Sequence, residues 1–264
     1  MSLTDDRKPD LVLIPGWGLG NAAWRPLLPA LEAHFRVHLF TLPGYDLAPD
    51  AVSPIAAAGP NARSFDDTVR AFIGALPPDA IVCGWSLGAE LALAMAARAP
   101  ERIRRLVLVG GTARFTTTDN WPDGQPPSLL ATFAESVATD ASAALQRFAA
   151  LINQGDTKAR PITRELSAAL RQAPLPTAQT LLSGLNWLRD IDLRDCVAQI
   201  KTPTLLVHGA HDPLMPLKAS EWLASQLPQA RLAVFANAAH APFLNDSARF
   251  ITLLRDSCHG PEFA

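Results

Sequence analysis

Ser86, Asp212 and His240 are of the residue types, and stand in the chain order, that nucleophilic catalysis by a serine requires. A serine hydroxyl is unreactive at neutral pH unless a base takes its proton and an acid orients that base. Ser86 lies in the segment GWSLG at 84–88, between a strand-like run and an alanine-rich helical pattern. This context is typical of a nucleophile elbow, a strained turn that exposes the hydroxyl. We therefore predict that Ser86 is a nucleophile rather than part of a turn that only packs.

Asp212 and His240 are the predicted acid and base that serve this serine. His240 follows the last strand-like segment, in the small-residue loop ANAAHAPF, and Asp212 ends the preceding one, in LLVHGAHDP. The order serine, acid, histidine along the chain is the one found in α/β hydrolases. His211, next to Asp212, is the main alternative base, and the alternative role for Asp212 is to cap a turn.

The glycine-rich segment LIPGWGLG at 13–20 is the predicted source of an oxyanion hole. We expect the backbone N–H groups of Trp17 and Leu87 to face the reacting carbonyl. Each such donor typically contributes about 3–4 kcal/mol to transition-state stabilisation. A phosphate-binding loop is the alternative, but the segment lacks the G-x-G-x-x-G spacing and the acidic residue that should follow it.

The elements that must position these residues alternate between strands and helices. Near-continuous apolar runs predict strands at 11–18, 35–44, 80–86, 103–111, 202–212 and 230–240. Helical patterns stand between and after them at 23–34, 65–76, 87–99, 217–227 and 246–257. Apolar runs of this kind suit parallel strands that are covered by helices on both faces. The sequence therefore predicts the α/β-hydrolase fold, with a mostly parallel, doubly wound sheet.

Residues 113–200 break this alternation, because they carry helical patterns and no strand signal. We predict that they form a helical lid inserted over the carboxyl edge of the sheet. The core would then consist of residues 1–112 and 201–264.

Composition excludes several classes of protein. The 264 residues are 48% hydrophobic with a net charge of −2, which excludes a disordered chain and a basic nucleic-acid-binding protein. No run of 18 apolar residues and no apolar leader occurs, so we expect neither a membrane span nor a secretory signal. The three cysteines have no metal-binding spacing and predict reduced thiols in a cytoplasmic protein, and we expect no metal and no cofactor.

Several segments resemble the pimeloyl-acyl-carrier-protein methyl ester esterases of biotin synthesis. The resemblance covers about residues 11–257, and it is carried by GWGL after the first strand, GWSLG at the elbow, AAHAPF at the base, and DNWP and RFAAL in the lid. It implies hydrolysis of the methyl ester of pimeloyl-acyl-carrier protein without a cofactor. It assigns the same nucleophile, acid, base and oxyanion donors as the residues themselves do.

The resemblance also implies substrate and partner contacts. Trp17, Phe148, Leu151 and Ile152 would line the acyl channel, although Phe148 and Leu151 are equally suited to packing between lid and core. Because acyl-carrier proteins are acidic, the lid should be locally basic. Residues 141–190 hold six basic and three acidic residues, a local charge of +3. We predict carrier docking by the residues Arg147, Arg160 and Arg164; the alternative is a solvated charged face.

The chain departs from the family pattern at three places. Pro15 stands where most members have histidine, and Ala143 stands where another basic residue is expected. The N-terminal hairpin of the family has no room in MSLTDDRKPD, so we expect a sheet that is one or two strands shorter.

Three kinds of activity fit these residues. One is the carrier-linked esterase, and the second is another hydrolase of this fold, either a broad short-chain carboxylesterase acting on small esters or a C–C bond hydrolase. The third is a binding protein that keeps a hydrolase pocket but turns over slowly, against which the complete set of serine, acid and base argues.

Overall fold

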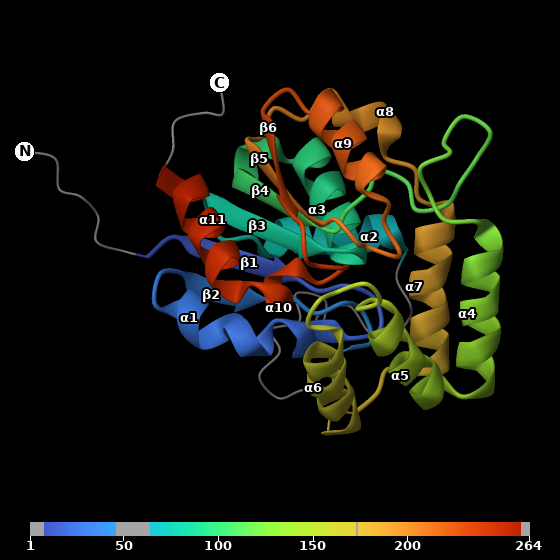
Figure 1. The fold of residues 1–264 in the computed structure, drawn as a ribbon. Helices are drawn as coiled ribbons and strands as arrows, with labels where there is room; N and C mark the ends of the chain where they lie inside the picture. The colour runs from blue at the N-terminus through green and yellow to red at the C-terminus, as the bar shows by residue number, and fades with distance from the viewer. Residues whose placement is uncertain (1–7, 46–63, 173, 260–264) are drawn as a thin grey trace, which may run out of the picture.

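A parallel sheet lies at the centre of the molecule (Figure 1). The computed structural model describes residues 8–45, 64–172 and 174–259. Within them the sheet has six strands, and every neighbouring pair is parallel. In spatial order the strands are β2 (Arg36–Leu39), β1 (Asp10–Ile14), β3 (Ala80–Trp85), β4 (Ile103–Val109), β5 (Thr204–Gly209) and β6 (Ala230–Phe235). The prediction of an α/β fold with a parallel sheet is confirmed.

Burial explains the unbroken apolar runs of the central strands. All residues of β3 and β5 are buried, whereas the edge strands β2 and β6 are partly exposed. Central strands of a parallel sheet are covered on both faces, so they show no alternation of polar and apolar residues. The strands are shorter than predicted: β1 ends at Ile14 because Pro15 has no N–H to give to the ladder. The remaining residues to 18 form the turn that carries the predicted oxyanion donor.

Helices cover both faces of the sheet (Figure 1). On one face lie α2 (Phe65–Ala75), α3 (Leu87–Arg98) and α9 (Leu217–Gln226), and on the other α1 (Leu28–Glu32) and α11 (Ser247–His259), with the short α10 (Pro242–Asn245) before it. In the part of the chain that the structure describes, no helix is long and apolar enough to cross a membrane.

The prediction of one continuous helix over 23–34 is wrong. Two 3-10 turns, η1 (Gly20–Ala23) and η2 (Arg25–Leu27), come first, and α1 is only five residues long. Pro26 and Pro29 explain the break, since each lacks the N–H that an α-helix needs for its i to i−4 hydrogen bonds.

Between β4 and β5 the chain leaves the sheet and forms an insertion, residues 113–200. Its helices are α4 (Pro127–Thr139), α5 (Ala141–Leu151), α6 (Ala159–Gln172), α7 (Ala178–Asp190) and α8 (Arg194–Val197). Figure 1 shows α4 to α7 gathered at one end of the sheet, whereas α8 contacts α3. The helical character predicted for this segment is thus present from α4 onward, and a non-helical loop, 112–126, precedes it.

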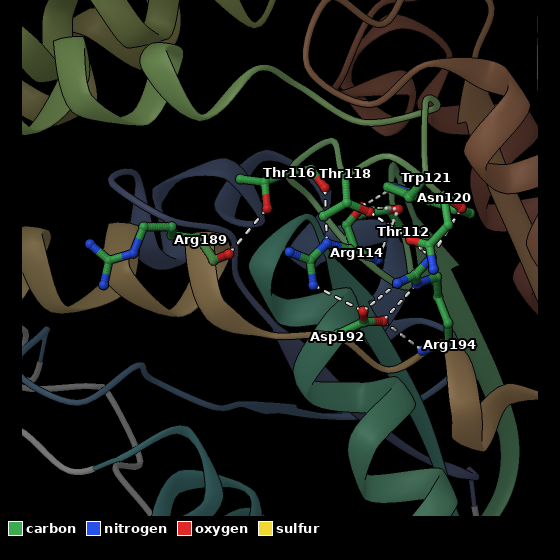
Figure 2. A network of polar contacts seen from close by, with 9 residues as sticks. All are labelled: Thr112, Arg114, Thr116, Thr118, Asn120, Trp121, Arg189, Asp192 and Arg194. Carbon is green, nitrogen blue, oxygen red and sulfur yellow. Dashed lines mark hydrogen bonds and ion pairs between the residues drawn. The ribbon is translucent and has the colours of Figure 1, made fainter.

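A polar network joins the start of the insertion to its end (Figure 2). Asp192 accepts hydrogen bonds from Arg114 at 2.9 Å and from Arg194 at 2.7 Å. Arg194 also donates to Asn120 and lies over the ring of Trp121. The hydrogen bonds from Arg194 are the main cause that lowers the pKa of Asp192 to about 2. The network therefore fixes both ends of the insertion to each other.

Candidate active site

Ser86 lies on a strained turn between β3 and α3. Its φ of 56° and ψ of −123° fall in a region that residues with a side chain rarely adopt, at a cost of about 1–3 kcal/mol. The glycines on either side make this turn possible. A Cβ at Gly84 would overlap the carbonyl of Gly88, and a Cβ at Gly88 would overlap the carbonyl of Ile14. Strand and helix thus cross too closely for any other residue at these positions.

The turn after β1 lies directly against this serine. A Cβ on Gly16 would stand 3.1 Å from the Cβ of Ser86. The next residue is Trp17, and in the described residues neither its N–H nor that of Leu87 donates a hydrogen bond. Leu87 begins α3, where the first N–H groups have no acceptor within the helix. Two backbone donors are therefore available beside Ser86.

Asp212 and His240 form a completely buried pair. Nδ1 of His240 lies 2.6 Å from Oδ2 of Asp212, and neither side chain is exposed. Oδ1 of Asp212 accepts the N–H groups of Leu214 at 2.8 Å and Met215 at 2.9 Å. Burial acts to raise the pKa of Asp212, but the charge and hydrogen bond of His240 outweigh it and the pKa is lowered. The carboxylate is thus ionised, and it holds the proton of His240 on Nδ1.

Ser86, Asp212 and His240 each follow the carboxyl end of a strand, β3, β5 and β6 respectively, and these ends lie along one edge of the parallel sheet. The indole N–H of Trp85, next to Ser86, donates to the carbonyl of His240 at 2.8 Å. A Cβ on Gly110, just after β4, would stand 3.0 Å from Nδ1 of His240. Nε2 of His240 is buried and has no hydrogen-bond partner among the described residues. It is the atom left to take a proton, and such catalytic contacts are often long before substrate binds.

The two histidines nearest to Asp212 in sequence are placed differently from His240. His211 is exposed, and its ring has no polar partner in the described part of the chain. His208 is buried: Nδ1 lies 2.7 Å from the hydroxyl of Ser220, and Nε2 lies 2.7 Å from the carbonyl of Met215. Burial lowers the pKa of His208, so it is neutral and donates from Nε2.

A small apolar cavity lies above Ser86, beneath the insertion. Its volume is about 20 Å³, roughly room for one water molecule. Of the four residues predicted to line the acyl channel, Trp17 and Phe148 line this cavity, and Leu151 and Ile152 do not. Ile152 follows the end of α5, and its carbonyl accepts the N–H of His240 at 3.1 Å. Ile152 therefore supports the base loop, residues 236–241, which carries His240.

Trp17, in the turn predicted to form the oxyanion hole, contacts three helices of the insertion. Its ring packs edge-on against the ring of Phe148 of α5, with 4.9 Å between the ring centroids, and against that of Phe133 of α4, with 6.1 Å between them. Its indole N–H donates to the carbonyl of Leu181, in α7, at 2.8 Å. On the same helix, a Cβ on Gly184 would stand 2.6 Å from Cδ1 of Trp17. The insertion is therefore closed tightly over the site.

The three arginines predicted to dock a carrier are all exposed. Arg147 lies on α5, and Arg160 and Arg164 lie on the neighbouring α6. In the described residues none of them has an ion-pair or hydrogen-bond partner. By contrast Lys158 donates to the carbonyl of Asn245 at 2.6 Å, and Arg189 pairs with the adjacent Asp190. Among the described residues of the insertion, the cations left for a partner are thus on α5 and α6.

Two polar residues of the insertion contact the catalytic loops, and sequence reasoning missed both. Gln125 donates to carbonyls of the loop that carries Asp212, and Asp156 accepts an N–H of the loop that carries His240. Each partner lies more than 80 residues away along the chain. No local pattern marks such a contact.

Within the described residues, no group of three His, Cys, Asp or Glu side chains is arranged to hold a metal ion.

Comparisons with known proteins agree with this architecture. The family model described as the alpha/beta hydrolase fold matches residues 9–247. The pimeloyl-acyl-carrier protein methyl ester esterase of Aromatoleum aromaticum is 41% identical over 258 residues, 96% of this chain and 99% of that protein. The protein of that name from Nitrosomonas europaea is 36% identical over 250 residues, 94% and 95% of the two chains. A solved esterase from Exiguobacterium antarcticum has the same fold, with a TM-score of 0.80, 21% identity, and coverage of 96% and 92%.

Proposed function

The chain belongs to the α/β hydrolase family and, within it, to the pimeloyl-acyl-carrier protein methyl ester esterases, and we propose that it cleaves that methyl ester in biotin synthesis. Two observations support the proposal: Ser86 stands on a strained turn after β3, and a buried Asp212–His240 pair follows β5 and β6 at the same edge of the sheet. The names of relatives that match almost the whole chain support the substrate.

The reaction proceeds through an acyl-enzyme. Nε2 of His240 takes the proton of Ser86 as its oxygen attacks the ester carbonyl, and the N–H groups of Trp17 and Leu87 stabilise the oxyanion. His240 then gives the proton to the departing methoxide, which leaves as methanol. Water attacks the acyl-enzyme as Nε2 of His240 takes its proton, and His240 then gives this proton to the oxygen of Ser86 as its bond to the acyl group breaks. The product leaves as the free acid, which ionises to the carboxylate. Asp212 stays ionised and balances the positive charge that His240 carries between these steps.

The apolar surroundings of Ser86 suit an acyl chain. Phe148 and Trp17 line the cavity that the methyl ester end would enter. Because the cavity is about 20 Å³, the insertion must shift before a pimeloyl chain can reach the serine. A short-chain carboxylesterase is the second candidate, since a small acyl group would require the least movement of the insertion.

Carrier docking on the insertion completes the proposal. Arg147, Arg160 and Arg164 present three unpaired cations on adjacent helices, and an acyl-carrier protein is acidic. Interactions of this kind raise the rate of encounter and set the orientation of the partners.

A cytoplasmic location stays a prediction. It is consistent with the three cysteines, which are all free thiols in the structure.

Two measurements test the function. The first compares kcat/KM for pimeloyl-carrier methyl ester with kcat/KM for a series of p-nitrophenyl esters; a preference for the carrier substrate supports the proposal, and a preference for short p-nitrophenyl esters supports the second candidate. The second asks whether the gene, but not its Ser86→Ala variant, restores growth without biotin to a strain that lacks its own methyl ester esterase. A single burst without further turnover would indicate a binding protein instead.

A further inference from the structure

We propose that the insertion does more than cover the site: Gln125 and Asp156 are positioning residues for two loops. Gln125 holds the acid loop, residues 210–216, which carries Asp212, and Asp156 holds the base loop, residues 236–241, which carries His240. The inference rests on the proposed esterase mechanism, because it concerns the hydrogen bond between Asp212 and His240. Neither residue touches the reacting atoms, so each acts through the residue whose loop it holds.

Gln125 holds the acid loop from above. Its Nε2 donates to the carbonyl of Pro213 at 3.1 Å and to that of Leu214 at 2.8 Å, so both amide hydrogens serve this loop. Its own backbone is fixed, since its N–H donates to Phe115 at 2.8 Å and its carbonyl accepts from Thr117 at 2.9 Å. These residues belong to the loop 112–126, which the network of Figure 2 ties to the end of the insertion. The amide is thus presented by a rigid support.

The acid loop depends on such contacts for its shape. The N–H groups of Leu214 and Met215 hold Oδ1 of Asp212, while the carbonyl of Met215 accepts from His208 at 2.7 Å. Gln125 supplies the donors for the carbonyls of Pro213 and Leu214, the two residues before Met215. Without Gln125 these two carbonyls lose the only side-chain donor that they have among the described residues, and the peptide groups that aim the carboxylate are free to rotate.

Asp156 holds the base loop through its carboxylate. The residue is 8% exposed, and its Oδ2 accepts the N–H of Ala239, the residue before His240, at 3.0 Å. Oδ1 accepts the amide of Asn245 at 2.6 Å, and that amide also reaches the carbonyl of Asn237 at 3.1 Å. The N–H of His240 itself donates to the carbonyl of Ile152, four residues before Asp156. One short segment of the insertion therefore holds the base loop at Ala239 and His240.

The test uses substitutions that keep size and remove donors or charge. Gln125→Met removes both N–H donors, and Asp156→Asn removes the charge and one acceptor. For hydrolysis of p-nitrophenyl acetate we expect kcat to fall on the order of tenfold to a hundredfold, as for small misplacements of reacting groups, with KM changed less than twofold. Gln146→Met and Asp140→Asn are the matched controls, since their contacts lie within the insertion, and both should keep wild-type kcat.

A double-mutant cycle separates positioning from general loss of structure. If Gln125 acts through the acid, Gln125→Met should have little further effect on kcat in an Asp212→Asn background. A purely structural contribution would lower kcat equally in both backgrounds, and that result would overturn the proposal for Gln125. If Gln125→Met does not fold, Gln125→Glu, which keeps the length of the side chain and loses the donors, replaces it in the same cycle.

Failure of the proposed function is recognised separately. If the wild type shows no hydrolysis that depends on Ser86, the downfield NMR resonance of the Nδ1 proton of His240 still reports the 2.6 Å bond to Asp212. Weakening or loss of this resonance in Gln125→Met and Asp156→Asn, but not in the two controls, supports the inference. A resonance unchanged from the wild type, or kcat within twofold of it in both folded variants, overturns the inference.

Discussion

Nδ1 of His240 lies 2.6 Å from Oδ2 of Asp212 in surroundings that admit no water to either side chain. The second oxygen of the carboxylate is held by two backbone N–H groups, so the acid cannot turn away from the histidine. This geometry fixes the proton on Nδ1 and leaves Nε2 as the proton acceptor. The relation explains why residues remote from Ser86 can matter for its reactivity.

Removal of the nucleophile should abolish ester hydrolysis without unfolding the protein. For Ser86→Ala we expect kcat to fall by on the order of 10⁴ to 10⁶, as for other serine hydrolases that lose the nucleophile. The strained backbone remains, so the melting temperature should stay close to that of the wild type. Initial rates and a thermal melt check both points. Wild-type turnover in this variant would exclude Ser86 as the nucleophile.

Reversal of the exposed arginine charges should weaken carrier recognition alone. In the triple variant Arg147→Glu, Arg160→Glu and Arg164→Glu, KM for the carrier-linked ester should rise roughly tenfold or more, since each surface pair contributes up to about 1 kcal/mol. KM for p-nitrophenyl acetate should not change. Salt should reduce the difference between wild type and variant, because exposed charges are screened. Equal effects on both substrates would contradict docking through these residues.

Gly184 and Gly74 offer a matched pair of helical glycines. A methyl group at Gly184 of α7 would press on Trp17, so Gly184→Ala should destabilise the closed insertion by about 1–3 kcal/mol and lower activity. A methyl group at Gly74 of α2 meets no atom within 4 Å among the described residues outside its own helical turn, and Gly74→Ala should stabilise the protein by about 0.5–1 kcal/mol. Urea unfolding and initial rates measure both. A gain in stability at Gly184 would show that Trp17 is not tightly held.

The ion pairs of Asp192 should make stability depend on pH in the acid range. Hydrogen bonds from Arg194 lower the folded-state pKa of Asp192 from 3.8 to about 2. As the pH falls toward this range, the unfolded state therefore binds more protons at Asp192 than the folded state does. The stabilisation is therefore complete above the unfolded pKa and is lost as pH falls through the folded one. Urea unfolding of the wild type and Asp192→Asn should differ at pH 6 and converge near pH 2. A difference independent of pH would contradict this assignment.

The sequence alone was sufficient for the order of strands and helices and for the residues proposed to react. Central strands are buried on both faces, so their apolar runs are visible without a structure. The elbow around Ser86 requires glycine at fixed positions, because backbone atoms of β1 and α3 cross there. The helix predicted over 23–34 failed because the effect of two prolines was underestimated.

Only the tertiary structure decided which parts of the insertion contact the catalytic loops. Ile152, expected in the acyl channel, instead accepts the N–H of His240, and Leu151 lies outside the cavity. Gln125 and Asp156 reach partners more than 80 residues away. Local periodicity reports how a segment is buried, but it holds no information on which distant backbone group a polar side chain meets. That choice depends on how the insertion packs on the sheet, which is fixed by the fold as a whole.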